Sequence, residues 1–254
     1  MSSMAPMSDA STDDASNIDD TDGCSFFALD DGPVPSPFEK DSEFFPQDTV
    51  NLTVVDLGVL RAPSGRVEAC DPFCCLGDGP VFDVKPGDYP VRVTVADVSK
   101  EQDGSHEREA YLSLVLGDGK PVTVEEAVEV SGPDWGVAVD AGAVALVDHE
   151  AVATAMPAVE DGADWYSDLF DSGEADSWFN LMDSSEHYRA GMANIVMPLA
   201  EAGENVALSH SGWGDGVYPV VLTRDADGLP VGLHIDLGVV GTFAVDENDE
   251  NDED

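Results

Sequence analysis

The sequence predicts an α+β fold that is mainly β: antiparallel sheets packed as a β-sandwich-like domain, with short helices inserted between strands and disordered acidic termini. Three observations lead to this prediction. Apolar residues alternate along several short segments, as in half-buried strands. Turns rich in Gly, Asp and Pro separate these segments. A helical period appears only between Asp148 and Gly191.

The first half of the chain supplies extended segments. Residues 1–22 are rich in Ser and Asp and poor in large apolar side chains, so we expect them to be disordered. Residues 26–45 mix aromatic residues with prolines, which predicts an extended segment lying on the domain. Residues 50–59 predict a strand that bends near Gly58, and residues 89–95 predict a half-buried strand.

Further along, residues 111–116 can return beside the strand at 89–95, and residues 136–148 read as two short strands around an Asp-Ala-Gly turn. Pairs of apolar residues four apart, such as Trp165/Leu169 and Trp178/Met182, then predict two or three short helices, the latter two separated by Gly173. Residues 192–197 and 205–208 return to a strand pattern.

The densest signal is a hairpin near the C-terminus. Residues 217–222 and 231–237 are apolar strand patterns joined by the turn Asp225-Ala226-Asp227-Gly228. Pro219 has no N–H and belongs at a bulge or a sheet edge. The turn does not fit a calcium loop, because Pro230 stands where that loop needs Gly. We therefore expect one domain over residues 23–245, followed by a disordered acidic tail over 246–254.

Acidic residues dominate the composition. The chain has 53 Asp and Glu against 10 Lys and Arg, a formal net charge of -43. Such self-repulsion destabilises a compact state in dilute buffer but is screened in molar salt, so we expect a protein from a salt-accumulating halophile. Nucleic acid and anionic membranes are unfavourable partners, because binding them requires Lys and Arg. A protein or small-molecule partner remains open.

The expected compartment is the cytoplasm. The N-terminus has neither the basic nor the apolar region of a signal peptide, and the most apolar stretch, residues 136–147, is too short to span a membrane. The cysteines are Cys24, Cys70, Cys74 and Cys75, with no C-x-x-C pair. In a reducing cytosol we expect small buried side chains, with a zinc site as the less favoured alternative.

Several acids stand at strand ends or in glycine turns, where carboxylates can either cap turns or cluster into a site. The candidates for metal binding are Asp71, Asp140 and Asp148. The candidates for catalysis are Asp215, Asp236 and His210. Asp215 lies in a tight glycine loop, residues 212–216, which lacks the lysine of a phosphate-binding loop, and we expect its carboxylate to cap backbone N–H groups. His234 shares a strand face with Asp236, so a structural hydrogen bond between them is possible.

With these segments in place, the chain resembles the domain-of-unknown-function family 4241. The landmarks are residues 65–72 (GRVEACDP), 86–91 (PGDYPV), 136–148 (GVAVDAGAVALVD) and 211–236 (SGWGDGVYPVVLTRDADGLPVGLHID). They cover roughly residues 50–240. Leu237 departs from the phenylalanine common in such relatives. The resemblance implies a domain identity and carries no catalytic role or cofactor.

These observations favour a non-catalytic binding or interaction module. The alternative is a hydrolase-like or metal-dependent enzyme that uses strand-end carboxylates and His210. An enzyme requires a concave pocket into which these side chains converge, whereas a binding module needs an apolar surface for its partner. The sequence identifies no cofactor.

Overall fold

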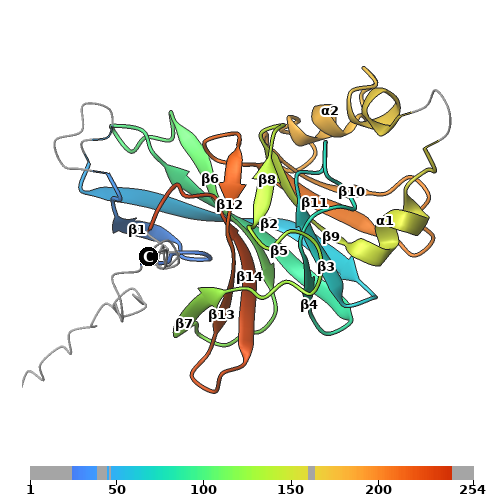
Figure 1. The fold of residues 1–254 in the computed structure, drawn as a ribbon. Helices are drawn as coiled ribbons and strands as arrows, with labels where there is room; N and C mark the ends of the chain where they lie inside the picture. Colours follow the sequence, from blue (N-terminus) through green and yellow to red (C-terminus); the bar gives the residue numbers. More distant parts are fainter. Residues whose placement is uncertain (1–24, 39–44, 46, 160–163, 242–254) are drawn as a thin grey trace, which may run out of the picture.

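The fold is built from antiparallel sheets that curl into a half-barrel (Figure 1). The computed structural model describes residues 25–38, 45, 47–159 and 164–241, so the predictions of disorder for residues 1–22 and 246–254 lie outside the described residues. Of the residues that the structure describes, 43% lie in strands and 9% in helices, which confirms the mainly β prediction.

The larger sheet has seven strands. Their order across the sheet is β1 (Gly32–Pro35), β2 (Thr49–Ala62), β5 (Gly87–Asp97), β6 (Glu107–Val115), β14 (Pro230–Asp236), β13 (Val220–Arg224) and β7 (Thr123–Glu126). The pairing of β2 with β5 shifts between Asp56 and Val59, and Gly58 between them has a φ of +82°, which favours glycine. The predicted bend near Gly58 is confirmed.

The smaller sheet has five strands and buries both of its faces. Their order is β10 (Met192–Val196), β11 (Asn205–His210), β9 (Ala143–Asp148), β3 (Arg66–Cys70) and β4 (Val81–Asp83). Along β9, Val144 and Leu146 pack against the larger sheet, whereas Ala145 and Val147 join a second core on the opposite face. This alternation makes β9 apolar throughout.

Three short helices cover that second face. They are α1 (His149–Ala155), a π-helical turn η1 (Tyr166–Phe170) and α2 (Trp178–Met182). Figure 1 shows α1 and α2 beyond β9–β11, on the side away from the β13–β14 hairpin. Asp148 begins α1 by accepting a hydrogen bond from the Ala151 N–H. Gly173 separates η1 from α2, as predicted.

Pro219 interrupts the first strand of the predicted hairpin more strongly than a bulge would. The chain there divides into β12 (Gly216–Tyr218), which pairs with β8 (Val137–Val139), and β13, which pairs with β14 and β7. Because proline has no N–H, the change of sheet takes place at the residue that cannot continue the ladder on both sides.

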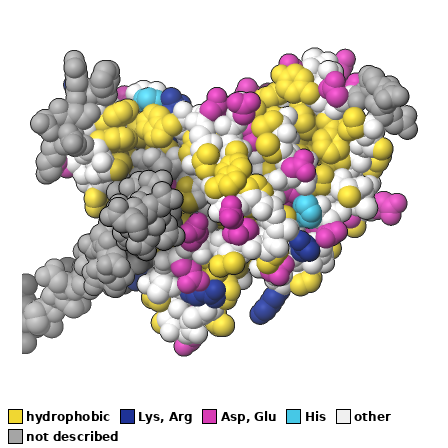
Figure 2. All heavy atoms as spheres, in the orientation of Figure 1, with side chains coloured by type: hydrophobic (Ala, Val, Ile, Leu, Met, Phe, Trp, Pro, Cys, Tyr) yellow, Lys and Arg dark blue, Asp and Glu magenta, His cyan; other side chains and the backbone are white. Residues whose placement is uncertain are grey.

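The surface carries the excess of acidic side chains. Figure 2 shows Asp and Glu spread over the face drawn, between patches of hydrophobic side chains. Among the described residues, no helix combines the length and apolar character needed to cross a membrane.

Candidate functional site

A pocket of about 590 Å³ opens between β4 of the smaller sheet and the β13–β14 hairpin of the larger one. Figure 1 places β4 and this hairpin at the same end of the molecule. The lining of the pocket comes from β4 and the turn after it, from the β6–β7 connection, from the segment after β7 and from the β13–β14 hairpin. The lining residues are Phe82, Asp83, Val84, Lys85, Tyr89, Leu116, Gly117, Asp118, Gly119, Ala127, Val128, Leu222, Arg224, Asp225, Leu229, Pro230 and Leu233.

The pocket is apolar inside and at part of its rim. Phe82 and Leu233 are buried in the core below it, and Leu222 is half-buried. At the rim, Val128 is 82% exposed and Leu229 is 60% exposed. Apolar side chains therefore continue from the core to the solvent, as in a pocket that accepts an apolar group.

Three polar side chains converge on the pocket. Arg224 donates from Nε to Glu125 Oε1 at 2.6 Å and from Nη1 to the Gly228 carbonyl at 3.2 Å, so its charge is already matched. The Tyr89 hydroxyl donates to the Lys85 carbonyl, and burial raises the pKa of Tyr89. Within the described residues the Lys85 ammonium forms no ion pair, which leaves it available to a ligand.

One wall of the pocket is held by the turn of the β13–β14 hairpin. Asp225 Oδ1 accepts the N–H groups of Asp227 at 3.0 Å and Leu229 at 2.9 Å. Gly119 lies so close that a methyl group there would come within 2.7 Å of Asp225 Oδ2. The predicted turn is confirmed, and its acid closes the backbone of the turn.

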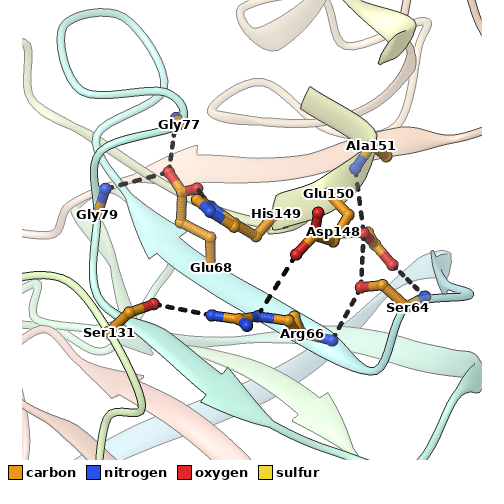
Figure 3. A network of polar contacts seen from close by, with 10 residues as sticks. All are labelled: Ser64, Arg66, Glu68, Gly77, Gly79, Ser131, Asp148, His149, Glu150 and Ala151. Atoms are coloured by element: carbon orange, nitrogen blue, oxygen red, sulfur yellow. Dashed lines mark hydrogen bonds and ion pairs between the residues drawn. The ribbon is translucent and has the colours of Figure 1, made fainter. Parts of the chain in front are cut away.

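A buried carboxylate fixes the opposite wall (Figure 3). Glu68 is fully buried, and its Oε1 accepts the N–H groups of Gly77 at 2.7 Å and Gly79 at 3.2 Å. Its Oε2 lies 2.7 Å from His149 Nδ1. Glu68 therefore ties the β3–β4 connection, which leads into the pocket-lining β4, to the start of α1.

Arg66 extends this network toward the pocket. Its Nη2 donates to Ser131 Oγ at 3.0 Å, and its Nε lies 3.7 Å from Glu150 Oε1 (Figure 3). The backbone of Ser131 pairs with Val81 of β4. The segment that follows Val128 is therefore fastened to the smaller sheet, and the apolar rim has a rigid base.

Two of the three metal candidates, Asp71 and Asp148, accept hydrogen bonds from backbone N–H groups, whereas the Asp140 side chain is exposed. Asp71 Oδ1 accepts the Phe73 N–H at 3.0 Å, and its Oδ2 accepts the N–H groups of Asp140 and Ala141 at 3.0 and 2.7 Å. Asp148 accepts from Ser64 and caps α1 (Figure 3). Across the described residues, Asp71, Asp140 and Asp148 do not form a cluster that could hold a metal ion, nor does any other group of three ligating side chains.

The catalytic candidates do not share one cavity. His210 lines a second cleft, of about 420 Å³, and its Nε2 lies 3.1 Å from Asp183 Oδ1. Neither Asp215 nor Asp236 lines this cleft. Asp236 is buried and accepts the Gly238 N–H at 2.9 Å, and burial raises its pKa to about 6. Of the three catalytic candidates, the structure places only His210 in this cleft, where Asp183 is the acid beside it.

The glycine loop also differs from its prediction. Asp215 is exposed, and no hydrogen bond to its carboxylate is found among the described residues. Instead Ser211 Oγ and the Tyr218 hydroxyl both donate to the Gly214 carbonyl at 2.7 Å. The loop is therefore closed by hydroxyl groups on either side of Asp215.

His234 is a core residue without a bond to Asp236. It is 1% exposed, and its Nδ1 and Nε2 lie 2.8 Å from Ser113 Oγ and 3.0 Å from Thr223 Oγ1. Burial lowers its pKa to about 3, so the imidazole is neutral.

The cysteines are only partly the buried side chains that we expected. Cys70 is buried, Cys75 is half-buried and Cys74 is exposed, while Cys24 lies outside the described residues. Cys74 and Cys75 bring their Sγ atoms to 3.6 Å. Burial and nearby acids raise the pKa of both the Cys70 and Cys74 thiols.

Sequence reasoning missed Lys85 and Tyr89 as pocket residues, and Glu109 and Asp183 as neighbours of His210. Lys85 immediately precedes the PGDYPV landmark and Tyr89 lies within it, and the landmark was assigned only to a turn leading into a strand. Asp183 follows the short helix α2, and no pattern in the sequence connects it with His210.

Comparison with known proteins gives one match. The profile of a protein family described as a protein of unknown function, DUF4241, matches residues 60–235. No curated protein and no solved structure matches the chain. The matched region contains both the 590 Å³ pocket and the His210 cleft.

Proposed function

Because this chain belongs to the DUF4241 family, a membership that carries no known activity, we propose its function from the pocket: a non-catalytic binding module whose ligand lies between β4 and the β13–β14 hairpin. The observation that carries the proposal is the continuity of apolar lining from core to rim beside the Lys85 ammonium, which forms no ion pair within the residues that the structure describes. The volume of the pocket falls in the range of about 300–1,000 Å³ that is typical of small-molecule sites.

The expected ligand has an apolar body and an anionic head. The body would replace water over Leu222, Val128 and Leu229, and this burial supplies the binding free energy. The head would lie near Lys85, because Arg224 is already occupied by Glu125. Asp83 and Asp118 at the rim disfavour a second anionic group.

This proposal ranks above the hydrolase alternative because, in the described part of the chain, the cleft that His210 lines includes neither Asp215 nor Asp236. It ranks above a metal-dependent enzyme because the oxygens of Asp71 and Asp148 are already used by backbone N–H groups.

The net charge of the chain bears on the salt conditions in which this module works. We propose that it works in the salt-rich cytosol of a halophile, where a net charge of -43 is screened. The same charge supports a partner other than nucleic acid or an anionic membrane.

Anilinonaphthalene sulfonate, which has an aromatic body and one sulfonate, is a suitable probe. We expect saturable binding with a stoichiometry of one, measured by its fluorescence in molar KCl. Leu229→Asp should weaken binding by about 10-fold, since partial burial of a leucine is worth about 1.5 kcal/mol. Lys85→Glu should weaken binding by a smaller, salt-dependent factor.

Leu199→Asp and Lys100→Glu are matched controls, because both side chains are exposed outside the pocket. Both controls should bind the probe as the unsubstituted protein does. Equal affinity in all four variants would refute the proposed pocket.

A further inference from the structure

The cleft that contains His210 is formed by the part of the chain with the densest sequence signal. The glycine loop after β11 forms one side and α2 forms the other, while the start of β6 supplies Arg108 and Glu109. The cleft holds about 420 Å³ and is more open than the apolar pocket. Trp213 in the loop is 44% exposed.

His210 contacts Asp183 on one side and borders Gly191 on the other. Its Nε2 lies 3.1 Å from Asp183 Oδ1, so the Nε2 proton points to Asp183 and Nδ1 keeps a lone pair when the ring is neutral. A methyl group on Gly191 would lie 3.1 Å from His210 Nδ1 and 2.7 Å from Glu109 Oε1. Nδ1 and the Glu109 carboxyl therefore border the same small space.

Arg108 differs from most arginines of this chain. Of six arginines, Arg66, Arg92, Arg189 and Arg224 lie within ion-pair distance of a carboxylate. Arg108 has no such partner among the described residues, and its buried Nε makes no hydrogen bond. Its guanidinium instead lies 5.4 Å from the centroid of the Trp213 ring, on the edge of the cleft.

An arginine without a carboxylate is unexpected in a chain with 53 acidic residues. A buried donor without an acceptor costs free energy, and a guanidinium offers a planar fork that suits carboxylate and phosphate groups. Two acids lie near Arg108. Asp183 is engaged by His210. Glu109 forms no ion pair with Arg108 within the described residues, although burial raises its pKa and a backbone hydrogen bond and the charges of His210, Arg189 and Arg108 oppose this rise.

We propose that the cleft is a second binding site, for a small organic anion whose acidic group is held by Arg108 and whose body lies against Trp213. His210 lines the same cleft, and with Nε2 directed at Asp183 its Nδ1 can accept a hydrogen bond only from an N–H or O–H group on the body of the ligand. This site is separate from the apolar pocket and takes a more polar ligand.

The test uses the full chain in buffered KCl at constant ionic strength, with benzoate and inorganic phosphate as probes. Binding is followed by quenching of tryptophan fluorescence. We expect saturable quenching at millimolar concentrations by at least one probe, with Trp213→Phe removing the signal. Arg108→Gln should weaken binding by about 10-fold or more, as expected for a hydrogen bond to a charged group.

Arg61→Gln is the matched control, because Arg61 also forms no ion pair with any described residue and does not line the cleft. It should leave binding unchanged, as should Lys85→Glu in the apolar pocket. Saturation by benzoate alone indicates an aromatic carboxylate, and saturation by phosphate alone indicates a phosphate group. The proposal is overturned if neither probe saturates, if Arg108→Gln binds like the unsubstituted protein, or if quenching survives Trp213→Phe.

Discussion

Replacing His234 with glutamine should flatten the dependence of stability on pH. His234 is neutral in the folded state because burial lowers its pKa to about 3, whereas the unfolded chain has the ordinary value of about 6.5. Below pH 6.5 the unfolded state therefore binds a proton that the folded state does not. Stability falls as the pH is lowered through this window, and the loss levels off near pH 3.

The magnitude follows from the two pKa values. At pH 5 the difference in proton binding at His234 costs about 2 kcal/mol of unfolding free energy relative to pH 7.5. This value depends mainly on the unfolded pKa, because at pH 5 the folded imidazole is already almost entirely neutral. Glutamine does not titrate, and it can still form hydrogen bonds with Ser113 or Thr223.

The measurement is chemical unfolding at pH 7.5 and pH 5 in molar KCl, for the unsubstituted protein and for His234→Gln. The variant should lose about 2 kcal/mol less than the unsubstituted protein between these two pH values. Its absolute stability at pH 7.5 does not enter the comparison, because each protein is referred to its own value. Parallel stability curves would show that His234 is not a buried neutral imidazole.

Three further perturbations test other parts of the structure. Asp236→Asn should raise the unfolding free energy at pH 7.5 by up to about 3 kcal/mol, because a folded pKa of about 6 means that the ionised carboxylate destabilises the folded state. This gain should disappear as the pH falls from 6 toward 4 in the same unfolding assay. Glu68→Ala should lower the unfolding free energy by about 3 kcal/mol or more, since it leaves two N–H groups and His149 without an acceptor. Its control, Glu150→Ala, should cost less than about 1 kcal/mol in the same denaturant titration. Transfer from molar KCl to dilute buffer should abolish compact structure, as followed by circular dichroism and sedimentation, and full stability there would contradict the halophile prediction.

The sheet segments were predictable wherever apolar residues alternate between glycine or aspartate turns. The bend at Gly58 and the turn at Asp225 follow from local chemistry and were found in place. Strands β4 and β7 were not predicted, because three or four residues are too few for a period to appear. The division at Pro219 depends on β8, a distant partner, which no local pattern identifies.

The candidate sites were less predictable than the fold. His210 was selected for its place beside a glycine loop, but its partner Asp183 is 27 residues away and reaches it only through the packing of α2 on the smaller sheet. Lys85 and Leu229 meet at one pocket because two sheets bring their edges together. Contacts between residues far apart in the sequence depend on tertiary packing, which local patterns do not predict. An aspartate that caps its own turn can be predicted, because its hydrogen-bond partners lie within a few residues of it.

The proline that divides β12 from β13 has a consequence for experiments. Gly214, before β12, belongs to the cleft, and Leu222, in β13, belongs to the pocket, so one short stretch of backbone runs directly from one cavity to the other. Each half of that stretch is held by its own ladder, and the peptide unit at Pro219 joins them. A substitution between Ser211 and Arg224 can therefore change the shape of both cavities at once. Ligand binding of any such variant needs to be measured for the apolar pocket and for the His210 cleft in parallel.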